Sequence, residues 1–101
     1  MEYSEREKWT QRVLAYLNHE RRRCTYGALA GILGLIPRSV GRRYLGKPRP
    51  EASRVVLKAT GKPSGYCADQ MAEGLCDGPD PITCPEELRR RVTEFEHRAV
   101  Q

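Results

Sequence analysis

The stretch CTYGALAGILGLIPRSVG, residues 24–41, has the pattern of two short helices joined by a tight turn. Thr25 is a favourable N-cap for the first helix, and Gly34 can adopt the left-handed conformation that ends it. Pro37 has the backbone angle that the first turn of a second helix requires. Residues 25–46 are therefore predicted to form a helix-turn-helix.

Arginine side chains are expected on the outer face of the second helix. Val40 and Leu45 occupy the inward positions of its register, which leaves Arg38, Arg42 and Arg43 facing solvent. A guanidinium group binds phosphate and base edges through paired hydrogen bonds. This face is therefore a candidate surface for contact with nucleic acid.

The positive charge of the chain is concentrated in its first part. Residues 1–62 contain 14 Lys and Arg against 5 Asp and Glu, a net charge of +9, whereas residues 63–101 contain 4 against 8, a net charge of −4. A basic surface attracts polyanions because binding releases counterions. The arginine run at residues 21–23 closes the first basic helix, where the helix dipole favours cations, and is expected to add phosphate contacts. A solvated basic face without a partner is the alternative interpretation.

Two longer helices are expected to flank the helix-turn-helix and to pack on its core. Ser4 and Glu7 have the spacing of a capping box and precede an apolar stripe typical of an amphipathic helix. A second stripe runs through residues 84–99, which are predicted to form a C-terminal helix. The stripes consist of Trp9, Val13, Tyr16 and Leu17, and of Leu88, Val92, Phe95 and Ala99.

The region before the C-terminal helix begins with a strand signal. Residues 53–59 are rich in β-branched and apolar side chains, and the TGKP sequence at residues 60–63 predicts a turn, which gives a β wing over about residues 52–63. Residues 64–83, rich in Gly, Asp and Pro, are predicted to be irregular. We therefore expect residues 1–101 to form a single, mainly α, small winged-helix domain with an N-terminal and a C-terminal packing helix.

Several classes of protein are disfavoured by the composition. No apolar run reaches the length of a membrane span, and the charged start is unlike a signal peptide, so we expect a cytoplasmic protein without a membrane partner. The four cysteines form no Cys-x-x-Cys pair and the two histidines lie near opposite ends, so neither a metal site nor another cofactor is expected. The cysteines are Cys24, Cys67, Cys76 and Cys84.

Short motifs occur in the order and spacing of one known family. The sequence TYG at residues 25–27 is followed by LA at residues 29–30, by PRSVG at residues 37–41 and by RVV at residues 54–56. Residues 25–62 thereby resemble the DNA-binding domain of alkylguanine-DNA alkyltransferases and of the non-catalytic alkyltransferase-like proteins. The resemblance implies DNA repair as the context of the function.

The resemblance also implies roles for two residues. In that family the motif tyrosine rotates a nucleotide out of the duplex, and the motif arginine enters the space left in the base stack. These roles fall on Tyr26 and Arg38 here. Together with the basic residues of the second helix and its connector, the expected DNA-binding residues are Tyr26, Arg38, Ser39, Arg42, Arg43, Lys47 and Arg49.

The chain differs from the family at the position of the alkyl-acceptor cysteine. The transferases have a Pro-Cys-His triplet before Arg-Val-Val, and the corresponding residues here are Glu51, Ala52 and Ser53. Ala52 has no nucleophile, and Ser53 cannot act as the imidazole base that activates a thiol. Alkyl transfer is therefore not expected, and no other catalytic set is present.

Binding of duplex DNA without catalysis is the function that these patterns favour. The alternative is a protein-interaction adaptor or inhibitor, for example one related to phage or defence systems, that reuses the winged helix to bind a protein. Its contact surface would be the acidic stretch at residues 69–80 or the last helix.

Overall fold

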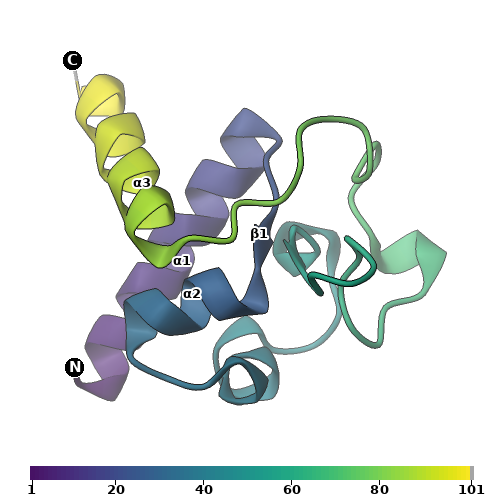
Figure 1. The fold of residues 1–101 in the computed structure, drawn as a ribbon, viewed down its shortest axis with the longest axis horizontal. Helices are drawn as coiled ribbons and strands as arrows, with labels where there is room; N and C mark the ends of the chain where they lie inside the picture. The colour runs from purple at the N-terminus through teal and green to yellow at the C-terminus, as the bar shows by residue number, and fades with distance from the viewer. Residues whose placement is uncertain (101) are drawn as a thin grey trace.

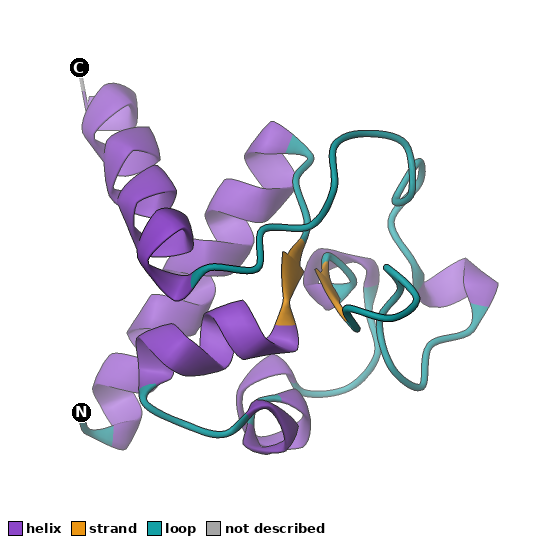
Figure 2. Ribbon diagram, viewed as in Figure 1, coloured by secondary structure: helices purple, strands orange, loops and turns teal. Residues whose placement is uncertain are grey.

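The computed structural model describes residues 1–100, and for Arg42 and Val100 it describes the backbone alone. The three α-helices gather on one side of the molecule and most of the irregular chain lies on the other (Figure 1 and Figure 2), which confirms the prediction of a mainly helical fold. Within the described residues, no helix has the length and apolar character needed to cross a membrane. In chain order the elements are α1 Tyr3–Glu20, β1 Cys24–Thr25, α2 Tyr26–Leu33, η1 Pro37–Ser39, η2 Gly41–Leu45, η3 Pro50–Ala52, β2 Val55–Val56, η4 Ala68–Gln70 and α3 Pro85–Val100.

α1 begins without the side-chain cap that the sequence predicts. The helix starts at Tyr3 and its N-cap is Glu2, so Ser4 lies inside the first turn. The Glu2 carbonyl accepts a hydrogen bond from the Arg6 amide at 3.0 Å. The predicted capping box of Ser4 and Glu7 is therefore wrong, because the backbone turn forms two residues earlier than the side-chain pattern indicates.

The ends of α2 have the caps expected from the sequence. Thr25 Oγ1 accepts a hydrogen bond from the Ala28 amide at 3.1 Å, which satisfies one of the free N–H groups of the first turn. Gly34 has a φ of 70°, and its amide donates to the Ala30 carbonyl. Other residues would be strained in this left-handed conformation, so glycine fixes the end of the helix.

The second helix of the predicted pair is not an α-helix. η1 is a single 3₁₀ turn and η2 is a single π-type turn, and the amides of Tyr44 and Leu45 both donate to the Val40 carbonyl. Val40 and Leu45 are buried, as the sequence predicts, and Gly46 follows the segment with a φ of 74°. π-type turns are often found at functional sites.

β1 and β2 form a two-stranded parallel sheet in which Cys24 is opposite Val55 and Thr25 is opposite Val56. Ile82 pairs with the other edge of β1, where its carbonyl accepts a hydrogen bond from the Thr25 amide at 3.0 Å. β1 is therefore held on both edges by segments that are distant in the sequence.

The strand predicted over residues 53–59 is too long. Only Val55–Val56 pair with β1, and the chain then turns: the Leu57 amide donates to the Lys62 carbonyl, and the Gly61 amide donates to the Leu57 carbonyl. Gly61 has a φ of 70°, which permits this tight turn. The β-branched residues of this segment are buried next to β1, but their presence does not predict how long the strand is.

The core is formed by the facing sides of the three α-helices and the two strands. Leu17 of α1, Leu29 and Leu33 of α2, and Leu88 and Val92 of α3 are fully buried. Complete burial of such a side chain stabilises a fold by about 1.5–3 kcal/mol. α3 begins one residue after the start predicted from its apolar stripe and ends one residue beyond the predicted end.

Arg12 and Glu96 form an ion pair between α1 and α3 at the surface, and Glu20 and Arg98 form another. Arg12 donates from Nε and Nη2 to the two carboxylate oxygens of Glu96, at 2.7 and 2.6 Å. The Arg12 guanidinium also lies over the ring of Trp9, 3.8 Å from its centroid. The hydrogen bonds from Arg12 lower the pKa of Glu96 below its ordinary value.

We predict that Gly31→Ala destabilises the fold. A Cβ at Gly31 would overlap the ring of Pro85 at the start of α3, so α2 and α3 would have to separate. Overpacking outweighs the helix propensity gained by alanine, and the free energy of unfolding should fall by about 1–2 kcal/mol in urea denaturation. Gly27→Ala is the matched control, because a Cβ there meets only Thr25 Oγ1 at 3.8 Å. A Gly31→Ala protein as stable as the Gly27→Ala protein would contradict the packing described here.

We predict a pH-dependent loss of stability in Glu96→Gln. The folded-state pKa of Glu96 is lowered, so its stabilisation is complete above the ordinary glutamate pKa of about 4.3 and is lost as the pH falls through the lowered value. At neutral pH the variant should lose about 0.2–1 kcal/mol of unfolding free energy, because the pair is partly exposed. The difference should vanish in strong acid. Glu94→Gln is the control, since Glu94 and Arg90 are 3.8 Å apart and both are exposed. An equal loss of unfolding free energy in both variants would contradict a specific contribution from the Arg12–Glu96 pair.

Candidate nucleic-acid interface

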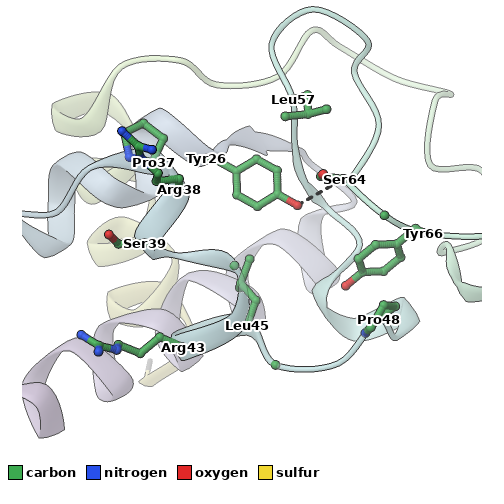
Figure 3. A pocket seen from close by; sticks show the side chains of 13 residues that line it. Tyr26, Pro37, Arg38, Ser39, Arg43, Leu45, Pro48, Leu57, Ser64 and Tyr66 are labelled. Atoms are coloured by element: carbon green, nitrogen blue, oxygen red, sulfur yellow. Dashed lines mark hydrogen bonds between the residues drawn. The ribbon is translucent and has the colours of Figure 1, made fainter.

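An open cavity of about 960 Å³ lies beside η1 and η2 (Figure 3). Its volume is at the upper end of the range for small-ligand sites, about 300–1,000 Å³. Two tyrosines, several apolar side chains and two arginines surround it, and none of the residues that line it is acidic. We call it the Tyr26 cavity. It is lined by Tyr26, Pro37, Arg38, Ser39, Gly41, Arg43, Leu45, Gly46, Pro48, Leu57, Ser64, Gly65 and Tyr66.

Tyr26 occupies the centre of this cavity (Figure 3). It is the first residue of α2 and follows β1 directly, so the pairing of β1 with β2 sets the position from which its ring projects. Tyr26 is partly buried, and its hydroxyl accepts a hydrogen bond from the Ser64 amide at 3.1 Å. Burial raises the pKa of Tyr26, and the hydrogen bond from Ser64 opposes that shift. The side chain is therefore a neutral phenol at physiological pH.

Three of the predicted DNA-binding residues on the second helical segment line the Tyr26 cavity. Arg38 follows Pro37 in η1 and is exposed, and Ser39 is partly exposed beside it. Arg43 in η2 is exposed, and its guanidinium points away from Tyr26 (Figure 3). The side chain of Arg38 lies beside Pro37, and its guanidinium also points away from the Tyr26 ring, so both arginines lie at the edge of the cavity (Figure 3).

The remaining predicted residues lie outside the cavity wall. The side chain of Arg42 falls outside the described part of the structure. Lys47 is exposed and Arg49 is partly exposed, both on the connector between η2 and η3, and neither lines the Tyr26 cavity. Their positions suit contacts along a phosphate backbone more than contacts with a group inside the cavity.

Part of the cavity wall comes from residues that the sequence did not single out. Leu57, Ser64, Gly65 and Tyr66 all line the Tyr26 cavity. The turn after β2 delivers all four, because the parallel pairing places that turn beside the start of α2. Residues 63–66 have the sequence PSGY, which is typical of a surface turn and does not by itself indicate a binding site.

The position corresponding to the family's alkyl acceptor is inside the core. Ala52 is buried in η3 and does not line the Tyr26 cavity. The hydroxyl of the buried Ser53 donates to the Pro50 carbonyl at 2.7 Å and accepts from the Ala72 amide at 2.8 Å. The hydroxyl therefore donates one hydrogen bond and accepts another, and both connect it to the backbone.

Two arginines of the basic segment, residues 1–62, are buried inside the fold. Arg23 is buried and donates to the carbonyls of Gly61 at 2.8 Å and Pro79 at 3.2 Å. Arg54 is buried too, and its burial, together with the nearby charges of Arg21 and Arg23, lowers its pKa. The expectation that the whole run at residues 21–23 contacts phosphate is therefore wrong for Arg23, because its guanidinium is bound to backbone carbonyls.

The cysteines do not combine into a reactive or metal-binding centre in the described residues. Cys24 is buried, and burial raises the pKa of its thiol. Cys67, Cys76 and Cys84 are free and exposed, and none of them lines the Tyr26 cavity. No group of three or more His, Cys, Asp and Glu side chains in the described chain is arranged to hold a metal ion.

Comparison with known proteins adds no assignment to this geometry. The chain matches no protein-family model, no curated protein and no solved structure.

Proposed function

We propose that this chain is a non-enzymatic duplex-DNA-binding protein of the winged-helix type, similar to alkyltransferase-like proteins. The observation that carries the proposal is the Tyr26 cavity, which opens beside a helical segment with exposed arginines and has no acidic residue in its wall. α2 with η1 and η2 would form the helix-turn-helix, and the turn at residues 57–62 would take the place of the wing.

Electrostatics supports a polyanionic partner at this face. Arg38, Arg43 and Lys47 are exposed along the segment that borders the cavity, and Lys58 and Lys62 are exposed on the turn after β2. Cations on the recognition segment and on the wing would contact phosphates on both sides of a groove. Arg23 and Arg54 are used inside the fold, so the described cations of the proposed DNA-binding face are these five and the partly exposed Arg49.

The cavity supports capture of a nucleotide turned out of the duplex. The Tyr26 ring at its centre and the apolar rim formed by Pro48 and Leu57 offer surfaces for a base. Arg38 lines the same cavity, and its guanidinium would have to turn from its present orientation to enter the gap in the stack. Unstacking a base costs a few kcal/mol, and least where the base is damaged or mispaired. A preference for damaged duplex follows from this arrangement.

Chemistry at the captured base is not part of the proposal. The alkyl-acceptor position is Ala52, which is buried and has no nucleophilic atom, and no cysteine lines the cavity. Binding without transfer would mark a damaged site and leave it chemically unchanged.

We predict that binding to undamaged duplex is mainly electrostatic. Raising salt from about 50 to 200 mM should weaken it roughly 10- to 100-fold if about three phosphates are contacted. In a fluorescence anisotropy titration, Arg43→Gln should weaken binding to all sequences similarly and reduce the salt slope by about 1. Arg90→Gln is the control, because Arg90 is exposed on α3, away from η2 (Figure 1). A salt-independent affinity, or no binding at low salt, would reject DNA binding and favour the protein-adaptor alternative.

We predict a modest preference for damaged or mispaired duplex, below the tenfold that about 1.4 kcal/mol provides. Tyr26→Phe and Arg38→Ala should each abolish the preference and leave salt-sensitive binding through Arg43 and Lys47. Mass spectrometry of the protein after incubation with an alkylguanine duplex should show no alkyl adduct. Equal affinity of the unsubstituted protein for both duplexes would remove nucleotide capture and leave simple groove binding.

A further inference from the structure

One large apolar side chain is exposed at the edge of the Tyr26 cavity. Among the described residues four side chains of this kind are exposed, and Leu57, which is 40% exposed, is the one that lines the cavity. In Figure 3 it lies on the turn after β2, on the opposite side of the Tyr26 ring from Arg43. The other three are Met1, Tyr3 and Ile36. A single exposed leucine is common on protein surfaces, so its surroundings decide whether it has a function.

The turn that carries Leu57 is held by its own backbone. The Leu57 amide donates to the Lys62 carbonyl at 2.9 Å, and the Leu57 carbonyl accepts from the Gly61 amide at 2.8 Å. Val56, directly before Leu57, is paired with Thr25 of β1. Leu57 therefore stands at a fixed place on the surface and cannot be withdrawn without breaking these hydrogen bonds.

The same turn is basic. Lys58 and Lys62 are exposed at its two ends, and residues 54–64 contain no acidic residue. These charges favour a polyanionic partner over an uncharged apolar one. Duplex DNA has apolar stacked bases behind its phosphates, so lysines that contact phosphate can bring a neighbouring apolar side chain to the bases.

Leu57 differs from Arg38, the residue to which the family resemblance assigns insertion into the base stack. The guanidinium of Arg38 points away from the Tyr26 ring (Figure 3). A charged group must also give up its hydration to enter the stack, whereas an apolar side chain gains free energy when it leaves water. Leu57 thus has the chemistry of an inserted side chain at a position that borders the cavity.

We propose that Leu57 is a wedge that enters the base stack of bound duplex DNA, at the step next to the nucleotide that the Tyr26 cavity would capture. This inference rests on the proposed function and adds a second inserted side chain to it. Apolar side chains that insert between base pairs unstack one step and kink the duplex by about 20–90°. Leu57 would therefore bend the DNA, whereas the exposed cations hold its phosphates.

The test combines two measurements on one short intact duplex that carries a donor dye at one end and an acceptor dye at the other. Fluorescence anisotropy gives the affinity, and energy transfer at saturating protein reports the bend. The unsubstituted chain should raise the transfer efficiency. Leu57→Gln keeps the size of the side chain and removes its apolar character, so it should lose most of this rise and bind roughly three- to tenfold more weakly. The salt dependence of binding should stay unchanged, because no charge is removed.

Matched variants separate the wedge from other effects. Leu57→Met should keep the bend, since methionine is among the side chains that insert between base steps. Ile36→Gln makes the same kind of change at an exposed apolar residue that does not line the cavity, and it should keep both affinity and bend. Tyr26→Phe leaves Leu57 in place, so it should keep the bend while the preference for damaged duplex is lost.

Three results would overturn the wedge and leave DNA binding intact. These are an unsubstituted chain that binds the duplex without bending it, a Leu57→Gln protein that bends it fully, and an equal loss of bend in Ile36→Gln and Leu57→Gln. The first is read on the unsubstituted chain, so a variant that fails to fold does not prevent a decision. The absence of any binding at low salt would reject the proposed function and the wedge together, which distinguishes it from failure of the wedge alone.

Discussion

The parallel pairing of β1 with β2, and of β1 with Ile82 on its other edge, is the constraint on which the rest of the structure depends. Only two residues of each strand take part, yet Cys24 is paired with Val55 on one edge and with Ile82 on the other, both far away in the sequence. Tyr26 follows β1 without an intervening residue, and the turn that carries Ser64 and Tyr66 follows β2. One short ladder therefore determines both the direction of the central ring and the position of the opposite wall of the Tyr26 cavity.

The sequence predicted correctly several features that depend on neighbouring residues, namely the caps of α2 and the buried positions of the segment that follows it. Thr25 and Gly34 take the cap positions expected of them. Val40 and Leu45 are buried as their spacing indicated, although a 3₁₀ turn precedes Val40 and a π-type turn ends at Leu45. The capping box at Ser4 failed because a carbonyl two residues earlier already closed the first turn. Such competition between backbone and side-chain acceptors is too finely balanced for a sequence pattern to resolve.

The sequence predicted only part of the candidate site, because residues distant in the sequence complete it. Tyr26, Arg38 and Arg43 were singled out by motif and charge, and the structure brings them to one cavity; their contact with DNA stays a prediction. Leu57 and Ser64 reach that cavity through long-range pairing, which no nearby residue signals. Net charge also overstated the basic surface, because Arg23 and Arg54 are buried. A count of cations does not distinguish those that face a ligand from those that bond the backbone.

The two hydrogen bonds of Arg23 have a consequence for the energetics of ligand capture. This guanidinium ties the turn after β2, at Gly61, to the segment before α3, at Pro79, and so acts as a non-covalent cross-link between two loops. Cross-linked loops sample fewer conformations, so less entropy remains to be lost when a ligand arrives. The wall that faces Tyr26 is thus preorganised by a side chain that never touches the cavity, and a captured group would meet a surface already in its bound shape.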